Sequence, residues 1–173
     1  MHGLGSGKTC SSITIAEGFK SRKEVIVLTP KSLLRNYIEE LKVCGDPLYK
    51  TNYYWKFVSV YGEKDSTPGI KIDLVKQIMS ELNISEAYIM ENKGAWIPDT
   101  TRKPNYEKLP VSEQKQINAQ INKMIESKYS FVSYNGLRND NINIRLKTFN
   151  GIKNPFDNKI VVIDEVHNFV SRI

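Results

Sequence analysis

The chain has 173 residues, 40% of them hydrophobic and 25% charged, and its 25 lysines and arginines against 19 aspartates and glutamates give a net charge of +6. This length and composition are typical of one soluble globular domain with a buried core. No stretch approaches the roughly 18 apolar residues of a membrane span. The N-terminus lacks a signal-peptide pattern, so we expect an intracellular protein without a membrane partner. The positive charge is compatible with a nucleic-acid partner but does not establish one.

The first predicted element is a phosphate-binding loop that opens into a helix over about 8–19. Its residues are Gly5, Ser6, Gly7, Lys8, Thr9 and Cys10. Glycines let the backbone wrap a phosphate, because a Cβ would block the close approach. The N–H groups and the positive end of the following helix then point at the anion. Lys8 is placed to reach the β- and γ-phosphates of ATP, and the Thr9 hydroxyl to ligate Mg²⁺.

The match to the full phosphate-loop pattern is incomplete, because His2 stands where the first glycine belongs. The shorter Gly-x-Gly-Lys-Thr form remains, and a glycine-rich turn without function is the alternative. No strand precedes the loop, so we expect a chain that is cut at its N-terminus. Ile13, Ala16 and Ile15 are the helix residues expected to face inward.

The two cysteines, Cys10 and Cys44, make neither a disulfide framework nor a Cys-x-x-Cys metal motif. Only two histidines accompany them. We therefore expect two free thiols and no structural zinc.

A buried strand is predicted over 24–29, where a short apolar run ends at Pro30. A helix over 33–43 follows, with Ser32 as its N-cap and Gly45 as its stop. Its apolar residues recur at three- and four-residue spacing: Leu33, Leu34, Tyr37, Ile38 and Leu41.

The segment from about 46 to 128 has weaker signals. A strand is expected over 55–60, and 92–108 is expected to be an irregular surface excursion that includes Trp96. Two helices are expected, over 71–82 and from Ser112 to 128. Their apolar stripes are Ile72, Val75, Met79 and Leu82 in the first, and Ile117, Ile121, Met124 and Ile125 in the second.

The last part of the chain contains two more predicted strands, over 129–134 and 159–163, with a possible helix around 137–146 between them. The second strand delivers the string Asp-Glu-Val-His at 164–167. In the phosphate-loop interpretation Asp164 holds Mg²⁺, and Glu165 orients and deprotonates the attacking water. The alternative is a strand end with solvated carboxylates. The loop and this string together favour a nucleotide hydrolase of the α/β class with a mostly parallel sheet.

The Asp-Glu-Val-His string resembles motif II of the superfamily two DExH (Swi/Snf-like) helicases, in which His167 would couple the site to neighbouring motifs. Two further stretches resemble motifs Ia and Ib of that branch, whose loops grip the nucleic-acid backbone. The resemblance assigns nucleic-acid contacts to Thr29, Pro30, Lys31, Ser133, Tyr134 and Asn135.

Longer stretches resemble the helicase-like ATPases of large nucleocytoplasmic DNA viruses, the group of the poxvirus nucleoside triphosphatase and the early transcription factor large subunit. These stretches are H-G-L-G-S-G-K-T-C-S-S, N-Y-I-E-E-L-K-x-C-G and I-D-E-V-H-N-F. The resemblance implies ATP hydrolysis with Mg²⁺, coupled to DNA more than to RNA and linked to viral transcription. It further implies RNA polymerase or transcription factors as partners, and location in the virion or in the viral factory of the host cytoplasm.

We therefore expect residues 1–173 to form part of a first RecA-like lobe, a three-layer α/β/α sandwich with a family-specific insert at about 46–128. The Ser-Ala-Thr motif and the second lobe of the family do not occur in the chain. Since the second lobe supplies an arginine finger, the chain alone should show little turnover. The alternatives are an AAA-type ATPase, a small phosphate-loop kinase, or a non-catalytic nucleic-acid-binding module.

Overall fold

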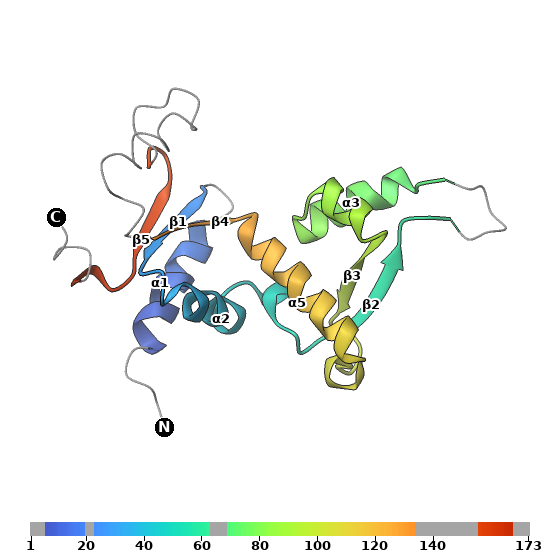
Figure 1. Cartoon of the computed structure of the whole chain (residues 1–173), viewed down its shortest axis with the longest axis horizontal. Coiled ribbons are helices and arrows are strands. Elements are labelled where there is room, and N and C mark those ends of the chain that lie inside the picture. The colour runs from blue at the N-terminus through green and yellow to red at the C-terminus, as the bar shows by residue number, and fades with distance from the viewer. Residues whose placement is uncertain (1–5, 20–22, 63–68, 134–155, 168–173) are drawn as a thin grey trace. The chain divides into compact units, whose positions relative to one another are not determined.

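The computed structural model describes residues 6–19, 23–62, 69–133 and 156–167 of the chain (Figure 1). The chain divides into two compact units, and each is described by itself. The first unit consists of 1–46 and 128–173, and the second of 47–127. Among the described helices, none is both long and apolar enough to cross a bilayer.

The first unit is built on a parallel three-stranded sheet with the strand order β4-β1-β5. The strands are β1 (Val25–Thr29), β4 (Tyr129–Ser133) and β5 (Ile160–Ile163). The central strand β1 is buried at every position, as its continuous apolar run predicts. Helices flank the sheet, so the α/β class and the parallel strands are confirmed.

The strand β5 is less buried than its sequence predicts. Val161 and Ile163 keep 38% and 41% of their surface exposed, while their neighbours are half-buried. These residues are exposed because β5 pairs with β1 on one side and forms an edge of the described sheet. The predicted strand is confirmed, although its continuous apolar run is only partly buried among the described residues.

The base of the sheet is tied together by Glu24, the residue before β1. Its carboxylate accepts a hydrogen bond from the Ser130 hydroxyl of β4 at 2.7 Å and forms an ion pair with Lys159, just before β5. The hydrogen bonds from Lys159 and Ser130 hold the pKa of Glu24 below its ordinary value. One carboxylate therefore connects all three strands.

Helices α1 (Ser6–Phe19) and α2 (Leu34–Cys44) pack against each other in the first unit. Ile13 and Ala16 are fully buried, as predicted, but Ile15 is 63% exposed, so its predicted inward orientation is wrong. Ile13 and Ala16 lie three residues apart on one helix face, and Ile15 lies on another.

The ends of α2 were predicted in part. Gly45 follows the helix and its N–H donates to the Leu41 carbonyl at 2.8 Å, so the predicted stop is confirmed. Ser32 is not the N-cap, because the helix begins one residue later and Leu33 takes that position without a side-chain hydrogen bond. Pro30 accounts for this, since its carbonyl accepts from the Leu33 N–H at 2.9 Å and closes a turn across Ser32.

Cys10 and Cys44 are joined in a disulfide, which corrects the prediction of two free thiols. Cys10 lies in the first turns of α1 and Cys44 ends α2. Because the two helices pack side by side, the Cα atoms stand 5.5 Å apart, within the range that a disulfide bridges. The sequence does not indicate this pairing, because the two cysteines lie 34 positions apart and meet only when the helices pack.

The second unit contains a two-stranded antiparallel sheet of β2 (Tyr54–Ser59) and β3 (Gly94–Asp99). The strand β3 overturns the prediction of an irregular excursion over 92–108, and its Trp96 is a core residue with 7% exposure. A proline within the run argues against a strand, but Pro98 lies opposite Trp55 in the register. The N–H of Trp55 is directed away from β3, so Pro98 interrupts no ladder bond there.

Both outer edges of this sheet are closed by a side-chain amide. Asn105 accepts from the Trp55 N–H at 2.7 Å and donates to the Trp55 carbonyl at 3.0 Å. Gln120 does the same at Trp96, with distances of 2.8 and 2.7 Å. Each carboxamide therefore replaces a neighbouring strand and satisfies backbone groups that burial would leave unpaired.

Helices α3 (Ile72–Leu82), α4 (Glu86–Glu91) and α5 (Val111–Glu126) complete the second unit, together with 3-10 turns at Pro47–Tyr49 and Tyr106–Lys108. The predicted stripe of α5 is confirmed, since its four apolar residues are all buried. That of α3 is confirmed at Val75 and Leu82, but Ile78 takes the place of Met79 and Ile72 is exposed. Ile72 is the first helical residue, before the packed face begins.

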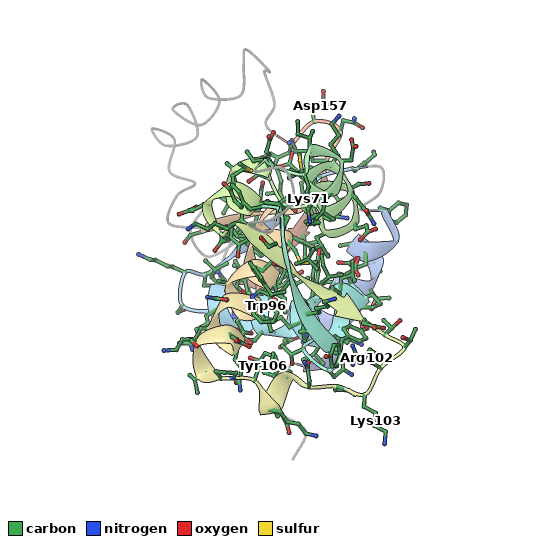
Figure 2. The ribbon with its side chains drawn as sticks, turned by 90° about the vertical axis from the view of Figure 1, so that its right-hand side faces the viewer. Lys71, Trp96, Arg102, Lys103, Tyr106 and Asp157 are labelled. Carbon is green, nitrogen blue, oxygen red and sulfur yellow. A yellow bond between two sulfur atoms is a disulfide. The ribbon has the colours of Figure 1, made fainter. Side chains whose placement is uncertain are left out.

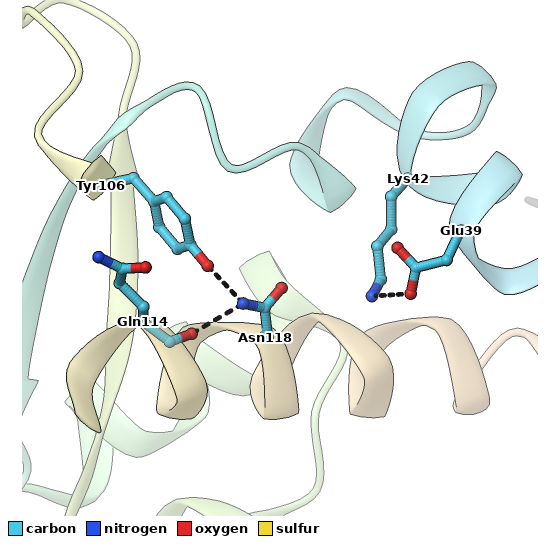
Figure 3. A network of polar contacts seen from close by, with 5 residues as sticks. All are labelled: Glu39, Lys42, Tyr106, Gln114 and Asn118. Carbon is cyan, nitrogen blue, oxygen red and sulfur yellow. Dashed lines mark hydrogen bonds and ion pairs between the residues drawn. The ribbon is translucent and has the colours of Figure 1, made fainter. Parts of the chain in front are cut away.

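The start of α5 is another corrected cap. Pro110 occupies the N-cap position, and Ser112 lies inside the first turn without capping it. Figure 3 shows how the preceding segment is held instead, by the Asn118 amide, which bonds to the Tyr106 hydroxyl and donates to the Gln114 carbonyl at 2.9 Å. In Figure 2, Arg102 and Lys103 lie on the exposed segment that leads from β3 to this turn.

Candidate nucleotide-binding site

The predicted phosphate-loop residues that the structure describes lie at the start of α1. The helix begins at Ser6, and Gly7, Lys8, Thr9 and Cys10 follow in its first turns. Gly5 lies outside the described residues. Lys8 is exposed and Thr9 is half-buried. The N-terminal end of α1 therefore brings together a cation, a hydroxyl and the N–H groups of a first helical turn, which have no partner within the helix itself.

Hydroxyl side chains support this first turn from the next one. Ser11 Oγ donates to the Gly7 carbonyl at 2.7 Å, and Ser12 Oγ donates to the Thr9 carbonyl at 2.8 Å. A Cβ added at Gly7 would meet no described atom within 4 Å. The packing of the described residues thus does not require glycine at this position.

Asp164 lies at the carboxyl end of β5, where its N–H donates to the Leu28 carbonyl at 2.9 Å and extends the pairing with β1. Thr29, the last residue of β1, is buried and its hydroxyl donates to Asp164 Oδ2 at 3.4 Å. Burial raises the pKa of Asp164 above its ordinary value and the charge of Glu165 raises it further, while hydrogen bonds from Thr29 and with the Glu165 backbone lower it in part.

Glu165 and His167 form an exposed pair beyond Asp164. His167 Nδ1 lies 3.2 Å from Glu165 Oε2, within reach of a hydrogen bond and of an ion pair when the imidazole is protonated. Glu165 has a φ of 53°, a left-handed conformation that is costly for a residue with a Cβ. The turn after β5 thus holds the Glu165 backbone in a strained conformation.

The carboxyl edge of the sheet brings several predicted residues together. Ser133 pairs with Thr29 in the register, and Asp164 follows β5 on the other side of β1. Pro30 and the exposed Lys31 form the turn after β1. Helix α1 contacts β5, so the helix that carries Lys8 and Thr9 neighbours the strand that delivers Asp164. Tyr134 and Asn135 lie outside the described residues.

Tyr37 of α2 is a residue of this region that the sequence marked only as apolar. Its ring is buried and its hydroxyl lies 3.4 Å from Ser12 Oγ of α1. Burial raises the pKa of Tyr37, and the negative charge of Asp164 contributes to the same shift. Tyr37 therefore contacts the loop helix and interacts electrostatically with Asp164. The sequence feature that could have identified Tyr37 is its aromatic ring in the helix that follows the Thr-Pro turn.

A comparison with curated proteins found one relevant similarity. The chain is 42% identical over 52 residues to a protein named "Putative ATP-dependent RNA helicase" of Acanthamoeba polyphaga mimivirus, and the match covers 30% of this chain and 9% of that protein. The chain thus corresponds to a small part of that protein's length. No protein-family description and no solved structure matches the chain. The similarity supports a relationship to viral helicase-like proteins.

Proposed function

We propose that the chain is the ATP-binding lobe of a nucleic-acid-dependent ATPase of the superfamily two DExH type. The observation that carries the proposal is the arrangement at the carboxyl edge of the sheet. Asp164 and Glu165 follow β5 there, Thr29 bonds to Asp164, and α1 with Lys8 and Thr9 contacts the same strand. A ligand in a parallel α/β sheet binds at this edge.

The residues present fit ATP with Mg²⁺. Mg²⁺ is bound in such sites by one or two carboxylates together with phosphate oxygens and water, and the Asp164 carboxylate and the Thr9 hydroxyl are donors of that kind. The N–H groups of the first turn of α1 suit phosphate oxygens, and Lys8 supplies positive charge. No described atom lies within 4 Å of a Cβ built at Gly7, which is compatible with a phosphate close to the backbone.

Each residue then has a defined role in hydrolysis. Lys8 would compensate charge on the β- and γ-phosphates, and Thr9 and Asp164 would hold the Mg²⁺ that binds with ATP. Glu165 orients the attacking water and accepts its proton, and its contact with His167 positions that carboxylate. The raised pKa of Asp164 means that a bound cation stabilises an otherwise unfavourable charge.

We assign the nucleic-acid contacts to the carboxyl ends of β1 and β4 and to the turn after β1. Lys31 is exposed in the turn after β1, and Ser133 ends the neighbouring strand. Cations and hydroxyls of this kind bind backbone phosphates. We assign the same role to Pro30, Tyr134 and Asn135 from the family resemblance. Thr29 is buried against Asp164, which suits a link between the two sites.

The resemblance favours DNA, a role in viral transcription with RNA polymerase or transcription factors, and action in the virion or in the host cytoplasm. The mimivirus relative is named for RNA. In the same proposal 1–173 are part of a first RecA-like lobe, and the second unit is a family-specific insert. A second lobe would complete the catalytic site by supplying an arginine.

Two measurements on the chain test this proposal. Fluorescence anisotropy with single-stranded and duplex oligonucleotides of DNA and RNA should show salt-dependent binding that Lys31→Ala weakens, with Lys103→Ala as an exposed control in the second unit. Steady-state ATP hydrolysis should be low and unstimulated. Anisotropy that no oligonucleotide changes would contradict the nucleic-acid role. Rapid, nucleic-acid-stimulated hydrolysis that Glu165→Gln abolishes would show that a second lobe is dispensable.

A further inference from the structure

The second unit contains a pocket that the proposed ATPase does not use. It has a volume of about 390 Å³ and lies between β3 and the helices α4 and α5. Aromatic and polar side chains share its wall, chiefly Phe57, Tyr88, Asn92, Trp96, Glu113 and Gln116. The volume is at the lower end of the range that ligand sites occupy.

The aromatic part of the wall is held firmly. Phe57 and Trp96 pack edge to face, with ring centroids 5.5 Å apart and planes at 65°. The Trp96 indole N–H donates to Gln116 Oε1 at 3.1 Å, and Gln120 fixes the Trp96 backbone on both sides. Phe57 lines the pocket and is 39% exposed, so part of an apolar aromatic side chain is accessible there.

The charged part of the wall is negative. Glu113 is half-buried, and no described residue forms an ion pair or a hydrogen bond with its carboxylate. Among the described residues, none of those that line the pocket is a lysine or an arginine. Burial and the charge of Glu91 both raise the pKa of Tyr88, so a second carboxylate acts on the same wall. Lys123 also interacts electrostatically with Glu91, but its ammonium group forms an ion pair with the Glu126 carboxylate at 2.7 Å.

We propose that this pocket binds an arginine side chain of a partner polypeptide. A guanidinium group is planar and cationic, so it stacks on aromatic rings and donates a fork of N–H groups to a carboxylate. The Phe57 ring and the Glu113 carboxylate offer these two contacts in one pocket. A nucleobase would also stack here, but its phosphate would meet Glu113 with no lining cation to offset the repulsion.

The proposal is tested on the whole chain with N-acetyl-Gly-Arg-Gly-amide as the probe, and with a matched peptide in which neutral citrulline replaces arginine. Binding is followed by tryptophan fluorescence, because Trp96 lines the pocket and the other tryptophan, Trp55, is buried elsewhere. The arginine peptide should change the fluorescence saturably, and the citrulline peptide should bind at least about tenfold more weakly.

Two variants and a control locate the binding. Glu113→Gln should weaken arginine-peptide binding about fivefold, as expected for a partly exposed charge pair, and Phe57→Leu should weaken it by a similar factor. Glu86→Gln changes an equivalent acidic residue in the first turn of α4, outside the pocket, and should leave binding unchanged. Thermal unfolding of each variant checks that it folds.

Four results would overturn the proposal. They are an absence of saturable fluorescence change with the arginine peptide, equal binding of the citrulline peptide, equal binding by Glu113→Gln and Phe57→Leu, and tighter binding of spermidine or of oligothymidylate to the same pocket. The test does not involve ATP, so its outcome is independent of the proposed ATPase.

Discussion

At the scale of single residues, Asp164 joins the stability of the first unit to its proposed chemistry. Its pKa is raised mainly because burial disfavours the ionised form. A carboxyl group with a raised pKa in the folded state favours folding below its unfolded pKa, and that contribution is lost as the pH rises through the folded value. At neutral pH the charge therefore costs stability, and a bound cation would offset this cost.

Asp164→Asn should consequently have opposite effects on stability and on ligand binding. We expect its thermal midpoint without ligand to equal or exceed that of the native chain at pH 7, and the difference to shrink as the pH falls through the pKa of Asp164. Mg²⁺-dependent ATP binding should be lost. Differential scanning calorimetry across pH measures the first effect, with the exposed Asp157→Asn as control. A large loss of ligand-free stability at pH 7 would contradict this explanation.

Two glycines offer a second test at the residue scale. Gly94 has a φ of 157°, and a Cβ there would collide with the Val58 carbonyl and the Phe57 ring. Gly94→Ala should lower the free energy of unfolding by about 2 kcal/mol or more. In Gly18→Ala the new Cβ meets no described atom within 4 Å, so the helix should gain up to about 1 kcal/mol. Chemical denaturation of both variants measures this contrast, and equal effects would contradict it.

At the scale of elements, the second unit depends on amide side chains where a larger sheet would use neighbouring strands. Gln120 is 1% exposed and satisfies both backbone groups of Trp96. Gln120→Leu keeps a similar volume but leaves a buried N–H and a buried carbonyl unpaired. We expect a loss of about 2–4 kcal/mol in urea denaturation.

The control for Gln120 is Gln77→Leu on α3, where the exposed amide bonds only to the Glu81 side chain at 2.8 Å. That change should stay within about 0.5 kcal/mol. Equal effects of the two substitutions would show that the bonds to the Trp96 backbone add nothing to stability.

The disulfide joins the two helices of the first unit and is a third element-scale test. Its loop spans 34 residues, for which the loss of chain entropy in the unfolded state corresponds to about 3–4 kcal/mol. Cys44→Ser should lower the stability of the oxidised chain by this amount, and a reductant should lower that of the native chain equally. Reductant should have no further effect on Cys44→Ser. Insensitivity of the native chain to reductant would contradict the pairing.

The sequence predicted the elements that follow from local patterns. The apolar runs of β1 and β5 and the apolar stripe of α5 are patterns within single chain segments, so local sequence alone finds them. The strand β3 was missed because its glycine and proline fit a strand through pairing with β2, where Pro98 lies opposite Trp55, whose N–H is bonded to Asn105. The caps at Ser32 and Ser112 failed because Pro30 and Pro110 set those turns.

In the candidate site, too, local patterns were predictable and contacts between distant segments were not. Motif spacing placed Lys8, Thr9, Asp164 and Glu165 on the correct elements, because these residues lie at strand ends and at a helix start. The contacts that modify them were not predictable. The bond from Thr29 to Asp164, the place of Tyr37 and the pairing of Cys10 with Cys44 all depend on how α1, α2 and the sheet pack together.

At the scale of the whole molecule, the central claim is that the first unit binds ATP through the start of α1 and the carboxylates after β5. Equilibrium dialysis of labelled ATP against the chain, with and without Mg²⁺, tests it most directly. Glu165→Gln should bind ATP within about twofold of the native chain, since the proton acceptor acts after binding.

Lys8→Ala should weaken the same binding at least about tenfold, because it removes the cation that contacts the phosphates. Lys23→Ala, an exposed cation outside the proposed site, is its control and should bind like the native chain. Equal ATP binding by Lys8→Ala and the native chain, or no Mg²⁺-dependent binding at all, would contradict the account.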